Sequence, residues 1–326
     1  MRADLYSADG KPMQHKHITA LCTALHLSNE RKGEESGQKS TSSSVQSWLC
    51  SPNRKLMLLA PSSAAVADNF RGSKCAPRLY DRLLAKVQRL RGLAYLEDGA
   101  VEASELTRDG RHVSPVDTEA WHVVSMDALG HIYGCARYMA HPNTVCFSDL
   151  IARSSALAWH PKWGDRLRRA IEADIATARR RGVAYVEVGG WALHKEARCT
   201  REVLRVALAT YALSRTLGGC IGLSTATVRH CSADILQKIG GRPLEFSGAP
   251  LPLYYDPQYR CEMAMLRFDS DESNPRYEHW TEEMQAQLST VPVVYHDAAG
   301  EAGVGSWRLV RENVLSSDRT ALTGIS

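Results

Sequence analysis

The chain has 326 residues, 44% of them hydrophobic, which is enough apolar material for one large core or two modest ones. Its 40 Lys and Arg residues against 36 Asp and Glu residues leave a net charge of +4, too small an imbalance to favour nucleic acid as the main partner. The nine cysteines are scattered, with no C-x-x-C pair and no histidine at zinc-ligand spacing. We therefore expect reduced thiols in a cytoplasmic protein and no metal site.

The ends of the chain differ in composition from its middle. No apolar run reaches the roughly 18 to 20 residues of a membrane-spanning helix, and the first residues lack a signal-peptide core. Residues 28–47 are polar and Ser-rich. We therefore predict a partly disordered N-terminal extension over 1–77, a folded domain over 78–290 and a poorly ordered tail over 291–326. The apolar stretch 53–68 is predicted to be a loop or short helix packing on the domain.

The predicted elements begin with a helix from residue 78 to 93, where apolar residues recur at three- and four-residue steps below a basic outer face. The strand-like runs 120–126 and 131–139, separated by the turn DALG, predict a β-hairpin. Residues 163–182 predict a second helix that stops at Gly182.

A largely buried strand is predicted over 183–193, and Gly189 and Gly190 interrupt it. Glycines inside a strand mark a bulge or a close approach to the backbone, so we predict a bulge there. A third helix is predicted from about Thr200, as its N-cap, to residue 218. The remaining predicted elements are a strand over 220–227, a short helix over 232–239 and a strand over 261–268.

The bulged strand fits one chemistry, the transfer of an acyl group from a thioester to an amine. Such a reaction needs hydrogen-bond donors for the thioester carbonyl and a base for the proton of the amine. A strand that bulges and splays from its neighbour frees backbone N–H groups, and it opens a slot for an extended pantetheine arm. The next predicted helix offers its N-terminus, near Arg198 and Arg201, to a phosphate.

Four motifs in this order and spacing connect the chain with a known family. They contain Arg91 in RLRGLAYLEDG, Asp117 in VDTEAWHVV, Arg137 in GHIYGCARYM and Glu187 in YVEVGGWAL. Between residues 78 and 270 the chain resembles the GNAT superfamily, and within it the autoinducer (acyl-homoserine lactone) synthases and the long-chain N-acyl amino acid synthases. The resemblance implies an α/β fold: a central mixed, mostly antiparallel sheet with a bulged, splayed strand and helices on both faces.

The resemblance also implies a catalytic centre on the bulged strand. Glu187 is expected to take the proton of the amine, directly or through a water. The backbone amides of Gly190, Trp191 and Ala192 are expected to bind the carbonyl oxygen, while the Trp191 side chain is expected in the core. The residues alone leave a second interpretation open, in which Glu187 faces solvent or an arginine.

The acceptor is expected to bind at Arg91, Asp117 and Arg137. Arg137 would orient a carboxylate of the acceptor. An ion pair between Arg137 and Asp117 across the hairpin is the alternative, and the same alternative holds for Arg91.

Two departures from the family narrow the substrates. Gly190 stands where autoinducer synthases carry an arginine, so an S-adenosylmethionine acceptor and a lactone product are not expected. Arg201 and Val203 fill positions that acetyl-CoA-using members keep as glycine, and their side chains would crowd a pyrophosphate. The single phosphodiester of a carrier-protein arm fits this loop better. The phosphate is expected at Arg198, Cys199, Thr200 and Arg201.

Acyl carrier proteins of this kind are acidic, and the predicted helix 163–182 offers arginines that could steer such a partner. They are Arg166, Arg168, Arg169, Arg179, Arg180 and Arg181. We therefore expect an N-acyltransferase that moves a long-chain fatty acyl group from acyl carrier protein or acyl-CoA to the amine of an amino acid or similar small acceptor. The acyl-phosphopantetheine thioester is its co-substrate, and no bound cofactor is expected. Two alternatives stay open: an acetyl-CoA-dependent small-molecule N-acetyltransferase, and a non-catalytic GNAT-like module that binds carrier protein or an acyl ligand.

Overall fold

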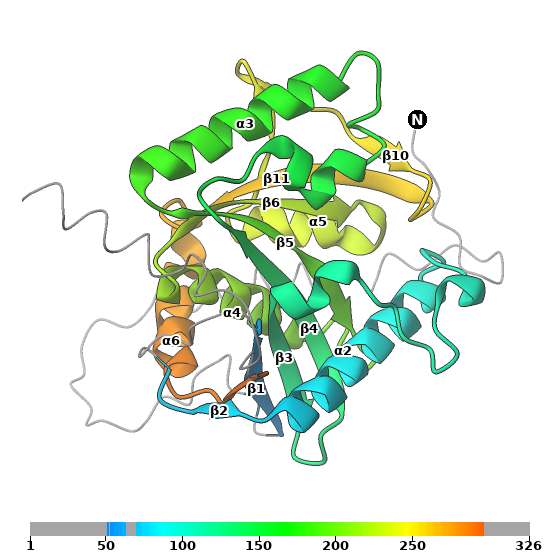
Figure 1. Cartoon of the computed structure of the whole chain (residues 1–326), viewed down its shortest axis with the longest axis vertical. Coiled ribbons are helices and arrows are strands. Elements are labelled where there is room, and N and C mark those ends of the chain that lie inside the picture. The colour runs from blue at the N-terminus through cyan, green and yellow to red at the C-terminus, as the bar shows by residue number, and fades with distance from the viewer. Residues whose placement is uncertain (1–50, 52, 63–69, 297–326) are drawn as a thin grey trace, which may run out of the picture.

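One ten-stranded sheet runs through the computed structural model, which describes residues 51, 53–62 and 70–296 (Figure 1). Its strands lie in the order β10-β11-β6-β5-β4-β3-β1-β12-β2, with β7 beside β11, and β8 and β9 form a separate pair. The β5–β6, β1–β12 and β12–β2 pairs are parallel and the other pairs are antiparallel. In chain order, the elements are β1 (Arg54–Ala60), β2 (Ser73–Cys75), α2 (Pro77–Glu97), β3 (Trp121–Asp127), β4 (Ile132–His141), α3 (Gly164–Arg181), β5 (Ala184–Leu193), α4 (Glu202–Thr216), β6 (Cys220–Thr227), α5 (Ser232–Lys238), β7 (Arg242–Pro243), β8 (Glu245–Phe246), β9 (Ala249–Pro250), β10 (Tyr254–Asp256), β11 (Cys261–Asp269), α6 (Glu278–Leu288) and β12 (Val293–Tyr295).

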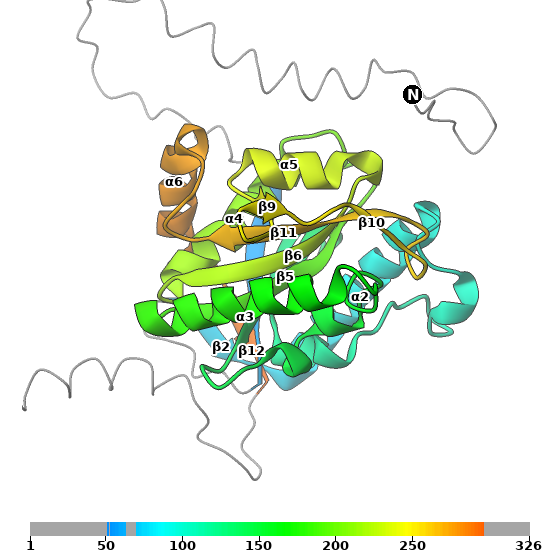
Figure 2. The ribbon, with the colours of Figure 1, turned by 90° about the horizontal axis from the view of Figure 1, so that it is seen from above.

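Helices cover both faces of the sheet, α2 and α3 on one face and α4, α5 and α6 on the other (Figures 1 and 2). The apolar stripe of α2, which includes Leu83 and Val87, is buried against the sheet as its spacing predicts. In α4 every residue from Glu202 to Ser214 is buried, because this helix lies between the sheet and α6. The predicted fold class, a mixed and mostly antiparallel sheet with helices on both faces, is confirmed.

The elements predicted from periodicity are confirmed as α2, the β3–β4 hairpin, α3, β5, α4, β6, α5 and β11. Gly182 ends α3 in the left-handed conformation, with a φ of 66°. The start of α4 differs from the prediction: Arg201, not Thr200, is its N-cap, and the Thr200 hydroxyl accepts a hydrogen bond from the Glu202 amide at 3.2 Å.

The predicted domain boundary at residue 78 is wrong. Residues Arg54–Ala60 form β1, a strand inside the sheet that pairs with β3 and β12, where a loop or short helix was expected. Leu58 and Leu59 point to opposite faces and both are fully buried, so the run shows no alternation that would mark it as a strand.

The C-terminal boundary at residue 290 is also wrong, because β12 (Val293–Tyr295) lies between β1 and β2. Both corrections have the same physical reason. The segments β1 and β12 join the sheet by pairing with strands distant in sequence, and neither segment has a periodicity that would predict a strand. The remaining residues of the two predicted ends, 1–50 and 297–326, lie outside the described residues.

Candidate active site

The sheet parts between β5 and β6. Their parallel ladder runs from Ala184 and Cys220 to Val188 and Ser224 and ends there. Beyond it β5 continues to Leu193 beside β4, and β6 continues to Thr227 beside β11. The facing edges of the two strands therefore present backbone groups that no longer pair with each other, which is the arrangement that an added extended chain can use.

The predicted bulge lies in β5 at this opening. The register with β4 passes from Arg137 opposite Gly189 to Cys135 opposite Ala192, so Gly190 and Trp191 together face a single residue of β4. Gly190 has a φ of 60°, and a Cβ there would lie 3.2 Å from the Arg91 Nη1 and from the Arg137 Cβ. Glycine is needed at this position for both its backbone conformation and its close neighbours.

A cavity of about 270 Å³ occupies the opening and is lined from both faces of the sheet. Tyr95 of α2 and Arg137 of β4 line it on one face, and Thr210 and Tyr211 of α4 line it on the other. The cavity therefore combines polar groups near the bulge with apolar side chains under α4 and α5, as sites for small ligands commonly do.

Two thiols line the cavity, and neither is suited to act as a nucleophile. Burial raises the pKa of Cys220 to about 11. Burial also raises the pKa of Cys261. Because the thiolate is the reactive form of cysteine, covalent catalysis by either residue is disfavoured at neutral pH.

Glu187 lines the cavity, and its carboxylate is buried and hydrogen-bonded through both oxygens. Oε2 lies 3.0 Å from the His141 Nε2 and accepts a hydrogen bond from the Ile151 amide at 2.9 Å. Oε1 accepts one from the Ala152 amide, also at 2.9 Å. No arginine of the described residues pairs with it, and its side chain is only 9% exposed, contrary to the alternative drawn from the sequence. Glu187 thus holds the N-terminal end of the 3-10 helix Ile151–Ser154 against the sheet.

Arg91 and Asp117 form a buried ion pair outside the cavity lining. The Arg91 Nη1 donates to the Asp117 Oδ1 at 2.7 Å, a second bond joins Nη2 to Oδ2, and Nη2 also donates to the His112 carbonyl at 2.9 Å. Burial favours a protonated Asp117, but the Arg91 guanidinium outweighs it and holds the Asp117 pKa below its usual range. The geometry matches the ion-pair alternative for these two residues.

Arg137 connects this pair with the cavity. Its Nη1 lies 3.4 Å from the Asp117 Oδ1, and the residue also lines the cavity beside Gly189. Its buried Nε has no hydrogen-bond partner among the described residues. Of the three predicted acceptor residues, Arg137 is therefore the one that belongs to the cavity lining.

The three predicted oxyanion residues differ in their surroundings. Gly190 and Trp191 line the cavity, whereas Ala192 is outside its lining and packs with the apolar residues of α2. The Trp191 side chain packs against the core under α4, as expected, and its buried Nε1 lacks a hydrogen-bond partner among the described residues.

The predicted phosphate loop is not part of the cavity lining. Arg198 forms ion pairs with Glu97 at 3.1 Å and Asp98 at 2.9 Å, at the end of α2. Cys199 is exposed with a φ of 59°, and the Thr200 hydroxyl donates to the Ala197 carbonyl at 2.7 Å. Arg201, the N-cap of α4, is exposed. The structure thus joins Arg198 to acidic side chains and leaves this loop outside the cavity lining.

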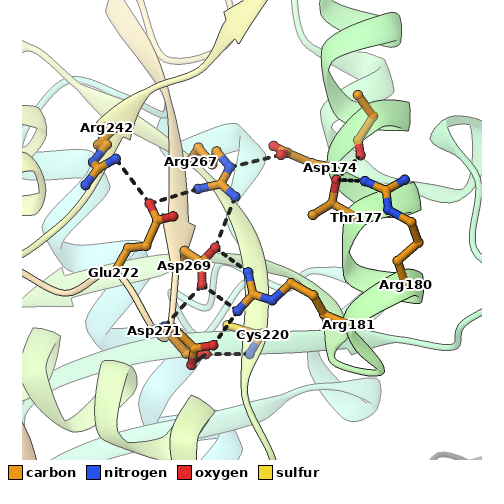
Figure 3. Close-up of polar contacts among 12 residues, drawn as sticks. Asp174, Thr177, Arg180, Arg181, Cys220, Arg242, Arg267, Asp269, Asp271 and Glu272 are labelled. Carbon is orange, nitrogen blue, oxygen red and sulfur yellow. Dashed lines mark hydrogen bonds and ion pairs between the residues drawn. The ribbon is translucent and has the colours of Figure 1, made fainter.

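All six predicted docking arginines make contacts within the chain, and three of them pair with carboxylates. Figure 3 shows Arg181 reaching from α3 to Asp269 and Asp271, each at 2.6 Å. Asp165 pairs with Arg168 at 2.7 Å and with Arg169 at 2.8 Å. The other three make contacts without a carboxylate: Arg179 donates to the carbonyls of Asn143 and Val145, Arg180 to the Thr177 hydroxyl, and Arg166 lies over the Trp163 ring. The positive field of α3 is therefore smaller than its sequence indicates.

Several cavity residues escaped the sequence analysis, among them Arg229, Asp256 and Tyr259. Arg229 follows β6, Asp256 ends the three-residue strand β10, and Tyr259 lies between β10 and β11; these segments have no periodicity, and no motif marks them. Among the described residues, no group of three His, Cys, Asp or Glu side chains could hold a metal ion. No helix in the same part of the chain is long and apolar enough to span a membrane.

The chain is similar in structure to several solved proteins. A CoA-dependent acyl-homoserine lactone synthase, BjaI, solved with SAM and isopentyl-CoA, is 14% identical with a TM-score of 0.45, over 79% of this chain and 99% of that one. FeeM, an N-acyl amino acid synthase from uncultured soil microbes, is 14% identical with a TM-score of 0.38, over 67% and 92%. An aminoglycoside N(6')-acetyltransferase from Legionella pneumophila is 10% identical with a TM-score of 0.30, over 69% and 99%. These neighbours are two synthases and an acetyltransferase. No protein-family model matches the sequence, and no curated protein matches it significantly.

Proposed function

We propose that this chain is an N-acyltransferase that moves an acyl group from a phosphopantetheine thioester to the amine of a small acceptor. The observation that carries the proposal is the parting of β5 and β6 after Val188 and Ser224, next to the bulge at Gly190. An extended pantetheine arm can hydrogen-bond to the freed strand edge as a further strand would. Apolar side chains on the α4 face of the cavity, such as Leu236 and Ile239, would then receive an acyl chain.

The reaction needs no covalent intermediate on the protein. The nitrogen of the neutral amine attacks the thioester carbonyl carbon, the C–S bond breaks, and the donor leaves as a thiolate that takes up the proton lost by the amine. Backbone N–H groups at Gly190 and Trp191 stabilise the developing oxyanion, and Glu187 receives the proton of the amine through a water. The raised pKa values of Cys220 and Cys261 favour this direct attack over a thiolate route.

The acceptor is proposed to be an amino acid or a similar carboxylate-bearing amine. Arg137 lines the cavity, and a guanidinium is well suited to hold a carboxylate. Arg91 and Asp117 would support it from behind without touching the acceptor.

A carrier-protein arm is the proposed donor. Glu97 and Asp98 already neutralise Arg198, which leaves less positive charge at this loop for the pyrophosphate of CoA. Arg166 and Arg180 would contact an acidic carrier protein, since within the chain they contact an aromatic ring and a hydroxyl.

The test is thiol release by purified protein given long-chain acyl carrier protein, long-chain acyl-CoA or acetyl-CoA, each with a pool of amino acids, followed by mass detection of the product. Release from the carrier-protein donor with an N-acyl amino acid product is the expected result. Release from acetyl-CoA alone would replace the donor assignment with that of an acetyltransferase. Binding of every donor without release would identify a non-catalytic module.

A further inference from the structure

Asp256, the last residue of β10, is a buried carboxylate at the cavity. It is 7% exposed and belongs to the cavity lining. Its Oδ1 accepts hydrogen bonds from the amides of Gln258 at 2.9 Å and Tyr259 at 3.2 Å. Within the described part of the chain, Oδ2 accepts no hydrogen bond, and no Lys, Arg or His nitrogen lies within 4.0 Å of this carboxylate. Backbone amides therefore bond to Oδ1 of Asp256, whereas no cationic side chain of the described residues balances the charge of this carboxylate.

The other carboxylates of the cavity lining are occupied. Glu187 is bonded through both oxygens to two backbone amides and His141. Asp98 forms an ion pair with Arg198. Because a buried charge is costly without a partner, an unpaired carboxylate facing a cavity points to a cationic group on the ligand.

A positive charge also lines the cavity, because Arg137 belongs to its lining. Burial raises the pKa of Tyr259, the Arg137 guanidinium opposes that rise, and the Asp256 carboxylate adds to it. Both charged groups therefore act on one tyrosine hydroxyl of the cavity lining. A chamber that carries charges of both signs fits a ligand that does so too.

We infer that Asp256 binds the ammonium group of the acceptor before that group loses its proton and attacks, so that the cavity selects dipolar amines, and amino acids in particular. This inference rests on the proposed function, which supplies the acceptor amine, and it adds the residue that recognises that amine. Asp256 also stabilises the turn over residues 257–260, because its Oδ1 accepts from the amides of Gln258 and Tyr259, as an aspartate at the start of a turn commonly does. The two roles are separable, because asparagine keeps an oxygen for the turn and removes the charge.

The experiment compares wild type with Asp256→Asn by calorimetric titration, without any acyl donor. The twenty common amino acids are titrated singly, and the one that binds most tightly is then compared with the 2-hydroxy acid that has the same side chain. This pair of ligands differs only in the ammonium group. Glu262→Gln is the matched control, because Glu262 is an exposed carboxylate on the strand beside β10 and is not part of the cavity lining.

Wild type and Glu262→Gln are expected to bind the amino acid at least about ten-fold more tightly than the hydroxy acid, and Asp256→Asn is expected to lose that preference with unchanged urea unfolding. An equal affinity of wild type for the two ligands, absence of amino acid binding, or a preference retained in Asp256→Asn would overturn the inference. If Asp256→Asn does not fold, Asp256→Ser serves instead, since its hydroxyl can still accept from the turn. Asp256-dependent amino acid binding without acyl transfer from any donor would leave the inference standing and refute the proposed function.

Discussion

Val188 of β5 and Ser224 of β6 form the last pair of a parallel ladder, and past them the two strands separate inside the sheet. Each strand keeps its other neighbour, β4 for β5 and β11 for β6, so the sheet stays continuous around the opening. Gly190 lies on the β5 side of this opening, with the buried Arg91 and the partly buried Arg137 beside it. Small changes here are expected to alter ligand binding and catalysis as well as stability.

Gly190→Ala is expected to destabilise the protein and to reduce acyl transfer. A side chain at a φ of 60° costs about 1 to 2 kcal/mol, and the new Cβ would also meet Arg91 and Arg137 at 3.2 Å. Gly248→Ala is the matched control, because Gly248 has a φ of 76° and a Cβ added there would meet no heavy atom within 4 Å. Urea unfolding should show a larger loss for Gly190→Ala, and equal losses would contradict the close packing at the bulge.

Glu187→Gln should reduce both stability and turnover. Glutamine can accept through one atom only, so its amide group would face donors that now bond to a carboxylate, and we expect a loss of about 1 to 3 kcal/mol. If Glu187 also receives the proton of the amine, the turnover number at a temperature where the variant is folded should fall about 100-fold or more. A variant that is destabilised but fully active would leave Glu187 with its structural role alone. The exposed Glu196→Gln serves as the control for both measurements.

Asp117→Asn should destabilise the protein strongly, because it leaves the Arg91 guanidinium buried without its counter-ion. Loss of one partner of a buried ion pair costs about 3 to 5 kcal/mol, and the two side chains are 1% and 2% exposed. Asp109→Asn removes the solvent-accessible carboxylate that pairs with Arg89 and Arg111, and it should change the free energy of unfolding very little. Chemical denaturation of the two variants checks this, and equal effects would show that burial does not govern the Arg91–Asp117 pair.

Stability should fall as the pH drops from about 6.5 to about 4. Burial lowers the pKa of His122 from 6.5 to about 4, so over this interval the unfolded chain binds more protons than the folded one. The His122 Nε2 lies 2.7 Å from the Asp117 carbonyl, and the buried Nδ1 has no partner among the described residues, so the fold offers nothing to a second ring proton. The contribution of this one group is on the order of 3 kcal/mol.

His122→Gln is expected to flatten that pH dependence, measured as the free energy of unfolding at pH 7 and pH 4.5. Burial also lowers the pKa of His112, which contributes in the same direction, so His112→Gln should flatten the profile in part. An unchanged slope in His122→Gln would show that the ring is not held neutral in the fold.

Much of the site could be predicted from short stretches of sequence. The paired glycines in an otherwise strand-forming run predicted the bulge, and Gly190 carries it. The same run placed Glu187 on a buried strand, but its partners His141, Ile151 and Ala152 come from another strand and a connecting segment. Local spacing contains no information about such partners.

Charged residues were the hardest to interpret from sequence, because their roles depend on which opposite charge lies nearby. From the sequence, Arg198 was predicted to bind a phosphate. In the structure it pairs instead with Glu97 and Asp98 at the end of α2. Arg181 resembled part of a docking surface, whereas it joins α3 to Asp269 of β11. Asp256 carried no signal in the sequence at all, since its burial and its lack of a counter-ion arise only where β10 meets the cavity.

The sequence by itself determined the elements whose side chains repeat locally, the amphipathic helices α2 and α3 and the β3–β4 hairpin, because periods of 3.6 and 2 residues are set by backbone geometry. It also determined the bulge, since glycine alone tolerates the conformation and the close packing at residue 190. Only the tertiary structure decided that Arg54–Ala60 and Val293–Tyr295 belong to the sheet, where β5 and β6 part, and which charges meet at the cavity. These features depend on contacts between segments far apart in the chain. Such contacts form only when the strands assemble into the sheet and the helices pack on its two faces.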